Sequence, residues 1–196
     1  LDLSDGSKLG ENPALFLITI LQQASLLNLE SLQWEQLPEE TREAMTKAWQ
    51  DWVAAKYGSM EKAVKAWKPD DPAAADTPPG IGSIIERRDA LAKDGLRFLA
   101  ETQQKFLADA VARFRNLGYS GLISCSNHSS SRPDLLGLAE MQTRTPGDVI
   151  ERHGALLTDF VPTYTIWQFN EGSMFADRSL LRLDSRKGQT AARFEL

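Results

Sequence analysis

The stretch from Asn12 to Leu27 reads NPALFLITILQQASLL. Its opening Asn-Pro dipeptide is a turn signal, and the run at 15–20 that follows is apolar on both faces and rich in β-branched residues. Strands with two apolar faces are typical of parallel sheets that helices cover on both sides. We therefore expect a buried strand here, with Gln22 and Gln23 at its carboxyl end.

The rest of the chain alternates helical patterns with further strand candidates. Apolar stripes and end signals predict helices over residues 38–57, 60–67, 84–117 and 133–145, the third with a break near Gly95. Short apolar runs predict strands over 119–126 and 148–150, and the Pro/Ala-rich residues 69–82 are expected to form a flexible surface loop. Strand and helix in alternation indicate parallel β/α units and therefore an α/β fold.

The composition is that of an ordinary globular protein. Of the 196 residues, 42% are hydrophobic and 25% charged, and the net charge is −5, which fits a single domain over residues 1–196. The chain lacks a dense basic cluster, so we expect no nucleic-acid partner. The longest apolar run, at 14–21, is too short to span a membrane, and residues 1–13 show no signal-peptide pattern.

Polar residues follow each predicted strand, and in parallel sheets ligands bind at the carboxyl ends of the strands. The three polar clusters are Gln22-Gln23-Ser25, Asn127-His128-Ser129 and Glu151-His153. Both histidines of the chain fall in these clusters, so we expect the clusters to line one groove. Trp167 is a further candidate for ligand binding. The other tryptophans lie in or beside helical patterns, where core packing is expected: Trp34, Trp49, Trp52 and Trp67.

Other kinds of site are less well supported by the residues. His128, His153 and Glu151 could supply three zinc ligands, but their spacing matches no known motif, and we expect no metal. An esterase-like hydrolase using Ser129 with a histidine is a further alternative, although the GxSxG motif is absent. The single cysteine, Cys125, lies inside an apolar strand and is expected to be buried and inert.

Four segments carry a family resemblance in the family's own order. They are residues 12–27, WQDWVAAKYGSMEKAVKAW at 49–67, RFLAETQQKFLADAVARFRNLGYSGLISCSNH at 97–128 and DVIERHG at 148–154. Together they resemble strands 4 to 6, with their helices, of the clan A (β/α)8-barrel glycoside hydrolases, the cellulase and β-galactosidase-like group. The resemblance implies half of a (β/α)8 barrel. Half a barrel leaves open edges, so a homodimer that completes the barrel is expected; the alternative is a monomer in which the segment from Phe160 onward folds over the open face.

The resemblance also implies a carbohydrate-active protein that cleaves or binds β-linked glycans without a cofactor. Gln23 stands where the family has the glutamate that acts as general acid/base, and an amide cannot carry that proton. If hydrolysis persists, Glu151 or His153 is expected to carry the proton, with Gln22, Asn127, His128 and Trp167 binding substrate. The alternative is a non-catalytic module that binds sugar or has only a structural role.

Overall fold

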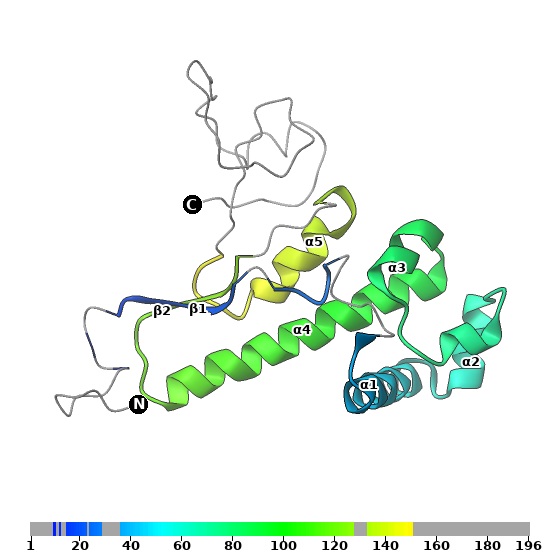
Figure 1. Ribbon diagram of the computed structural model, residues 1–196, viewed down its shortest axis with the longest axis horizontal. Helices are drawn as coiled ribbons and strands as arrows, with labels where there is room; N and C mark the ends of the chain where they lie inside the picture. The colour runs from blue at the N-terminus through cyan, green and yellow to red at the C-terminus, as the bar shows by residue number, and fades with distance from the viewer. Residues whose placement is uncertain are drawn as a thin grey trace, which may run out of the picture.

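The computed structural model describes residues 10, 12, 15–22, 24–28, 36–127 and 133–150, with side chains described from residue 136 onward in the last range (Figure 1). Along the chain the elements are β1 (Leu17–Leu21), α1 (Glu39–Tyr57), α2 (Met60–Trp67), the 3-10 helix η3 (Pro72–Ala75), α3 (Ile81–Arg87), α4 (Ala90–Asn116), β2 (Leu122–Ser126) and α5 (Pro133–Arg144). Helices therefore make up most of the described structure.

The two strands pair in parallel, as expected, but the prediction of half a (β/α)8 barrel is wrong. The register runs from Leu17 opposite Leu122 to Leu21 opposite Ser126, and the sheet has two strands within the described residues. The predicted strand at 148–150 contributes one isolated parallel bridge, between Val149 and Ser124. Two strands and a bridge do not form the curved wall that a barrel requires.

Asp148 shapes the contact of the predicted third strand with β2 just before the bridge at Val149. Its carboxylate accepts a hydrogen bond from the Ile123 amide at 2.8 Å and forms an ion pair with Arg115. Both the Asp148 and Val149 amides donate to the Ile123 carbonyl, at 2.8 and 3.3 Å. A side chain thus takes an amide that a continuing backbone ladder would use.

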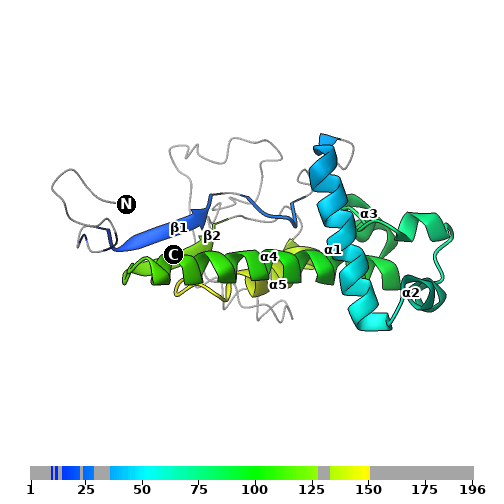
Figure 2. The same ribbon diagram turned by 90° about the horizontal axis from the view of Figure 1, so that it is seen from below.

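Helix α4, with 27 residues, organises the molecule. Figures 1 and 2 show α1, α2 and α3 gathered around its amino-terminal part, while the strands and α5 lie along the rest of it. The predicted break near Gly95 is wrong, because the helix begins at Ala90 and continues through that residue. The break lies before it, where Arg88 has a φ of 54° and the Asp89 carboxylate caps α4 by accepting from the Ala92 amide at 2.8 Å.

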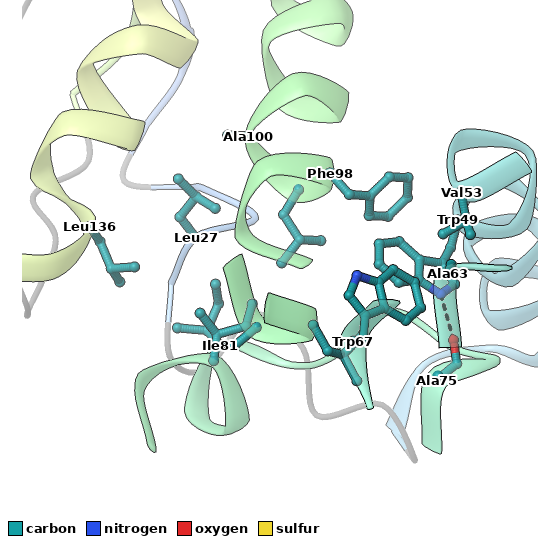
Figure 3. Close-up of a cluster of buried hydrophobic side chains, with 14 residues drawn as sticks. Leu27, Trp49, Val53, Ala63, Trp67, Ala75, Ile81, Phe98, Ala100 and Leu136 are labelled. Carbon is teal, nitrogen blue, oxygen red and sulfur yellow. Dashed lines mark hydrogen bonds between the residues drawn. The ribbon is translucent and has the colours of Figure 1, made fainter. Parts of the chain in front are cut away.

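The main core lies among the helices rather than on the sheet (Figure 3). Trp49 is fully buried and stacks against Trp52 and Trp67, with ring centroids 5.6 Å apart in each pair. The Trp49 indole N–H donates to the Ala75 carbonyl at 2.8 Å. The prediction that helical tryptophans pack in the core is confirmed for these three, whereas Trp34 lies outside the described residues. Because Ala75 belongs to η3 and is buried, this part of the 69–82 connection is packed rather than extended.

Candidate functional site

The carboxyl ends of β1 and β2 lie side by side. Leu21 and Ser126 are partners in the register, so the next residues, Gln22 and Asn127, leave the sheet at the same edge. Gln22 is exposed, whereas Asn127 is only 4% exposed. The Ser126 hydroxyl donates to the Ala24 carbonyl at 3.2 Å and thereby ties the end of β2 to the loop after β1. We call Gln22, Ala24, Ser25, Ser126 and Asn127 the strand-end edge.

The strand-end edge contains two of the seven predicted site residues, Gln22 and Asn127. The other five lie outside the described residues: Gln23, His128, Glu151, His153 and Trp167. Ser129, the nucleophile of the esterase alternative, lies outside them as well. The roles assigned to these residues stay predictions.

Side chains from two helices hold the loop that follows β1. Ser25 Oγ lies 3.0 Å from Gln103 Oε1 of α4 and also forms a hydrogen bond with Glu140 Oε1 of α5. The Leu26 amide donates to Gln103 Oε1 at 2.6 Å, and the Leu27 amide donates to Ser25 Oγ at 3.0 Å. Two amides of a loop without regular structure are therefore satisfied by buried side chains.

The polar contacts continue between α4 and α5. Gln103 Nε2 donates to Thr143 Oγ1 at 2.8 Å, and the Thr143 hydroxyl donates to the Glu140 carbonyl at 2.8 Å. The Glu140 carboxylate pairs with Arg144 Nη2 at 3.2 Å, and both side chains are almost fully buried. A buried charge pair of this kind is tolerated only when hydrogen bonds satisfy its members. We call Ser25, Gln103, Glu140, Thr143 and Arg144 the buried polar network.

The helical members of the buried polar network were not predicted from the sequence, although a signal for them exists. Gln103 falls between Leu99 and Leu107 at four-residue spacing, which places a polar residue on the buried stripe of α4. Glu140 follows Leu136 by four residues in the same way on α5. A polar residue at a core position predicts a buried hydrogen-bonded partner, but it does not say which partner.

Cys125 is fully buried within β2, as expected. Burial raises the pKa of its thiol above the ordinary value of 9.0, so the reactive thiolate is disfavoured at neutral pH. The structure thus supports the prediction that this cysteine is inert.

A groove of about 400 Å³ lies elsewhere, between α4 and α5. Its lining residues are Lys93, Leu96, Arg97, Ala100, Glu101, Gln104, Leu138, Ala139 and Gln142. None of them belongs to the strand-end edge.

The described part of the chain shows neither a metal-binding cluster nor a membrane span. The described residues contain no group of three or more histidine, cysteine or acidic side chains placed to hold a metal ion. Within the same part of the chain, none of the helices is both long and apolar enough to cross a bilayer. Comparison of the chain with protein-family models, curated proteins and solved structures finds no match.

Proposed function

We propose that the chain is a carbohydrate-active protein that binds a β-linked glycan at the strand-end edge. The observation that carries the proposal is the register of β1 and β2, which brings Gln22 and Asn127 to one edge, where the side chain of Gln22 is exposed and Asn127 lies buried beside it. A primary amide both donates and accepts hydrogen bonds, which suits the hydroxyl groups of a sugar. A few convergent polar groups at the carboxyl ends of parallel strands are the usual place for such a ligand.

The described residues favour binding over cleavage. Glycoside hydrolysis in its common form needs two carboxyl groups that flank the scissile bond. Among the described residues, Glu140 is the carboxylate next to the strand-end edge, but it is 3% exposed and bonded to Ser25 and Arg144. It cannot reach a glycan. Cleavage would therefore depend on Glu151 or His153.

Binding is tested by titration calorimetry with soluble β-glucans on the wild type and on Gln22→Ala. We expect saturable binding that Gln22→Ala weakens about three- to tenfold, the loss of one net hydrogen bond of about 0.5–1.5 kcal/mol. Gln50→Ala, at an exposed glutamine of α1, is the matched control and should bind like the wild type. Absence of binding at millimolar glucan, or equal weakening by both variants, would reject the proposal.

Hydrolysis is a separate arm of the same test. Release of reducing sugar from β-glucans, or of nitrophenol from nitrophenyl glycosides, would indicate an active enzyme. Turnover that disappears in Glu151→Gln or His153→Ala would assign the proton transfer to that residue. Binding without turnover in the wild type, with turnover gained in Gln23→Glu, would instead identify a module that has lost its general acid/base.

A further inference from the structure

The loop after β1 has an uncommon source of hydrogen bonds. The Leu26 and Leu27 amides are bonded to Gln103 Oε1 and Ser25 Oγ rather than to a neighbouring strand or helix turn. The Leu26 amide, which bonds Gln103, belongs to a half-buried residue, and the following Leu27 is fully buried in the helical core, so loss of these bonds would cost the loop stability. The conformation of the loop thus depends on a side chain that lies 77 residues further along the chain.

The orientation of that side chain is itself fixed. The Thr143 hydroxyl has one proton, which it donates to the Glu140 carbonyl at 2.8 Å. Thr143 Oγ1 must therefore accept a hydrogen bond from Gln103, which only the amide nitrogen can donate. The amide oxygen of Gln103 then faces the loop, where it accepts from the Leu26 amide.

The network is costly unless it is complete. Gln103, Glu140, Thr143 and Arg144 are each at most 3% exposed. Apolar side chains could fill this space without the cost of removing polar groups from water. A buried polar network, by contrast, is stable only in the arrangement in which its polar groups form hydrogen bonds with one another. Buried polar groups of this kind favour one conformation of the segment that they hold.

We infer that Gln103 and Glu140 are positioning residues that hold the loop at 24–28 in one conformation and so fix Ala24 and Ser25 of the strand-end edge, beside which Gln22 is presented. The inference rests on the proposed function, because it concerns the presentation of Gln22 to the glycan. It adds two residues of α4 and α5 to the machinery of the strand-end edge, although neither contacts a ligand there.

Amide hydrogen exchange tests the loop without any ligand. In Gln103→Leu, protection of the Leu26 amide should fall at least tenfold. Gln104→Leu is the matched control, because Gln104 is the next residue of α4 and bonds the Gln142 carbonyl and Thr145 hydroxyl instead. Thr143→Val removes the hydroxyl that accepts from Gln103 and donates to the Glu140 carbonyl, and it should lower the same protection to a smaller extent. This second variant serves if Gln103→Leu does not fold.

Glucan affinity then shows whether Gln103 acts by holding the loop in place or only by stabilising the fold. Gln103→Leu should weaken binding about tenfold, while Gln104→Leu leaves it unchanged. Leu107→Ala, which removes buried apolar volume from α4, should lower the melting temperature but keep the affinity of the folded protein. Equal weakening by Leu107→Ala, or unchanged affinity in Gln103→Leu, would overturn the inference.

Failure of the proposed function gives a different result. If the wild type binds no glucan, that function is rejected, and the exchange data still decide whether Gln103 holds the loop. Unchanged Leu26 protection in both Gln103→Leu and Thr143→Val would overturn the inference whatever the wild type binds.

Discussion

Asp94 of α4 binds side chains from both α1 and α2. Its carboxylate accepts hydrogen bonds from Lys56, from the Tyr57 hydroxyl and from the Trp67 indole, the last at 2.9 Å. Burial alone would raise the pKa of Asp94, but the hydrogen bonds from these three donors lower it below the ordinary value of 3.8. The ionised carboxylate is therefore the form that the folded protein prefers.

This preference predicts an acid-dependent stability. Because the folded-state pKa of Asp94 is lower than its unfolded value, the carboxylate contributes its full stabilisation above the unfolded value. The contribution is lost as the pH falls through the folded value. Asp94→Asn should lower the free energy of unfolding at pH 7 by about 1–3 kcal/mol and reduce its decline in acid. Urea unfolding from pH 7 to pH 3 measures both effects.

Asp51→Asn is the control for this prediction. Asp51 pairs with Lys47 at 2.8 Å on the exposed face of α1, where such pairs contribute about 0–1 kcal/mol. A loss in Asp51→Asn as large as that in Asp94→Asn would contradict the role assigned to the three hydrogen-bond donors of Asp94.

Two glycines of the helices are expected to respond in opposite directions to the same change. A Cβ at Gly95 of α4 would lie 2.2 Å from Pro79 Cγ, whereas a Cβ at Gly82 of α3 would meet nothing within 4 Å. Gly82→Ala should stabilise by up to about 1 kcal/mol, because alanine is the better helix former. Gly95→Ala should destabilise by about 1–3 kcal/mol, since the overlap outweighs that gain.

Thermal or urea unfolding of the two glycine variants gives the comparison directly. If Gly95→Ala were as stable as Gly82→Ala, the close approach of Pro79 to α4 would be wrong.

Elements defined by local signals are the ones that the sequence predicts well. Helix α1 ends where Gly58 adopts a φ of 85°, and α2 begins where the Ser59 hydroxyl accepts from the Lys62 amide at 3.2 Å. Gly95 was misleading because its role is packing against a distant loop rather than breaking a helix. At the candidate site, strand-end position alone predicted that Gln22 and Asn127 leave the sheet at one edge, whereas their roles in binding stay predictions.

The rest of the site depends on tertiary contacts. Gln103 and Glu140 meet Ser25 from 78 and 115 residues away, and no local pattern specifies such a partner. The predicted third strand also depends on such contacts, since beside its one bridge the side chain of Asp148 takes a hydrogen bond that a backbone ladder would use.

On the scale of the whole molecule, the prediction of half a barrel is wrong because the helices bury their apolar side chains against one another and not against a sheet. The segment between β1 and β2 contains α1, α2 and α3, whose side chains pack with one another and with α4. Alternation of strand and helix indicated β/α units, but it did not reveal that these helices build a core of their own. Completion of a barrel is therefore not a reason to expect a homodimer.

A homodimer stays a prediction, now on a different ground. Phe16 and Leu122 lie at the amino ends of the paired strands, and their side chains are 70% and 45% exposed. Leu122 is in register with Leu17, so the two side chains lie on opposite faces of the sheet. Phe16, the more exposed of the two, is the candidate for an association site. We expect a dimer by light scattering at micromolar concentration, and a shift toward monomer in Phe16→Asp.

Phe106→Asp is the matched control for the dimer, because Phe106 is 54% exposed on α4. A monomer mass for the wild type, or an equal shift in both variants, would contradict this assignment of the interface.

The tryptophan arrangement gives the helical core an optical signature of its own. Trp49 lies between Trp52 and Trp67 with interplanar angles of 9° and 13°, so the electronic transitions of the three indoles are coupled. Coupled chromophores whose transition dipoles are twisted relative to one another produce an exciton couplet in circular dichroism, and its amplitude falls when the rings separate. A denaturation experiment followed at that couplet would report melting of the helices around α4, while the strands could be followed by another probe. Non-coincident transitions would reveal two cooperative units in one short chain.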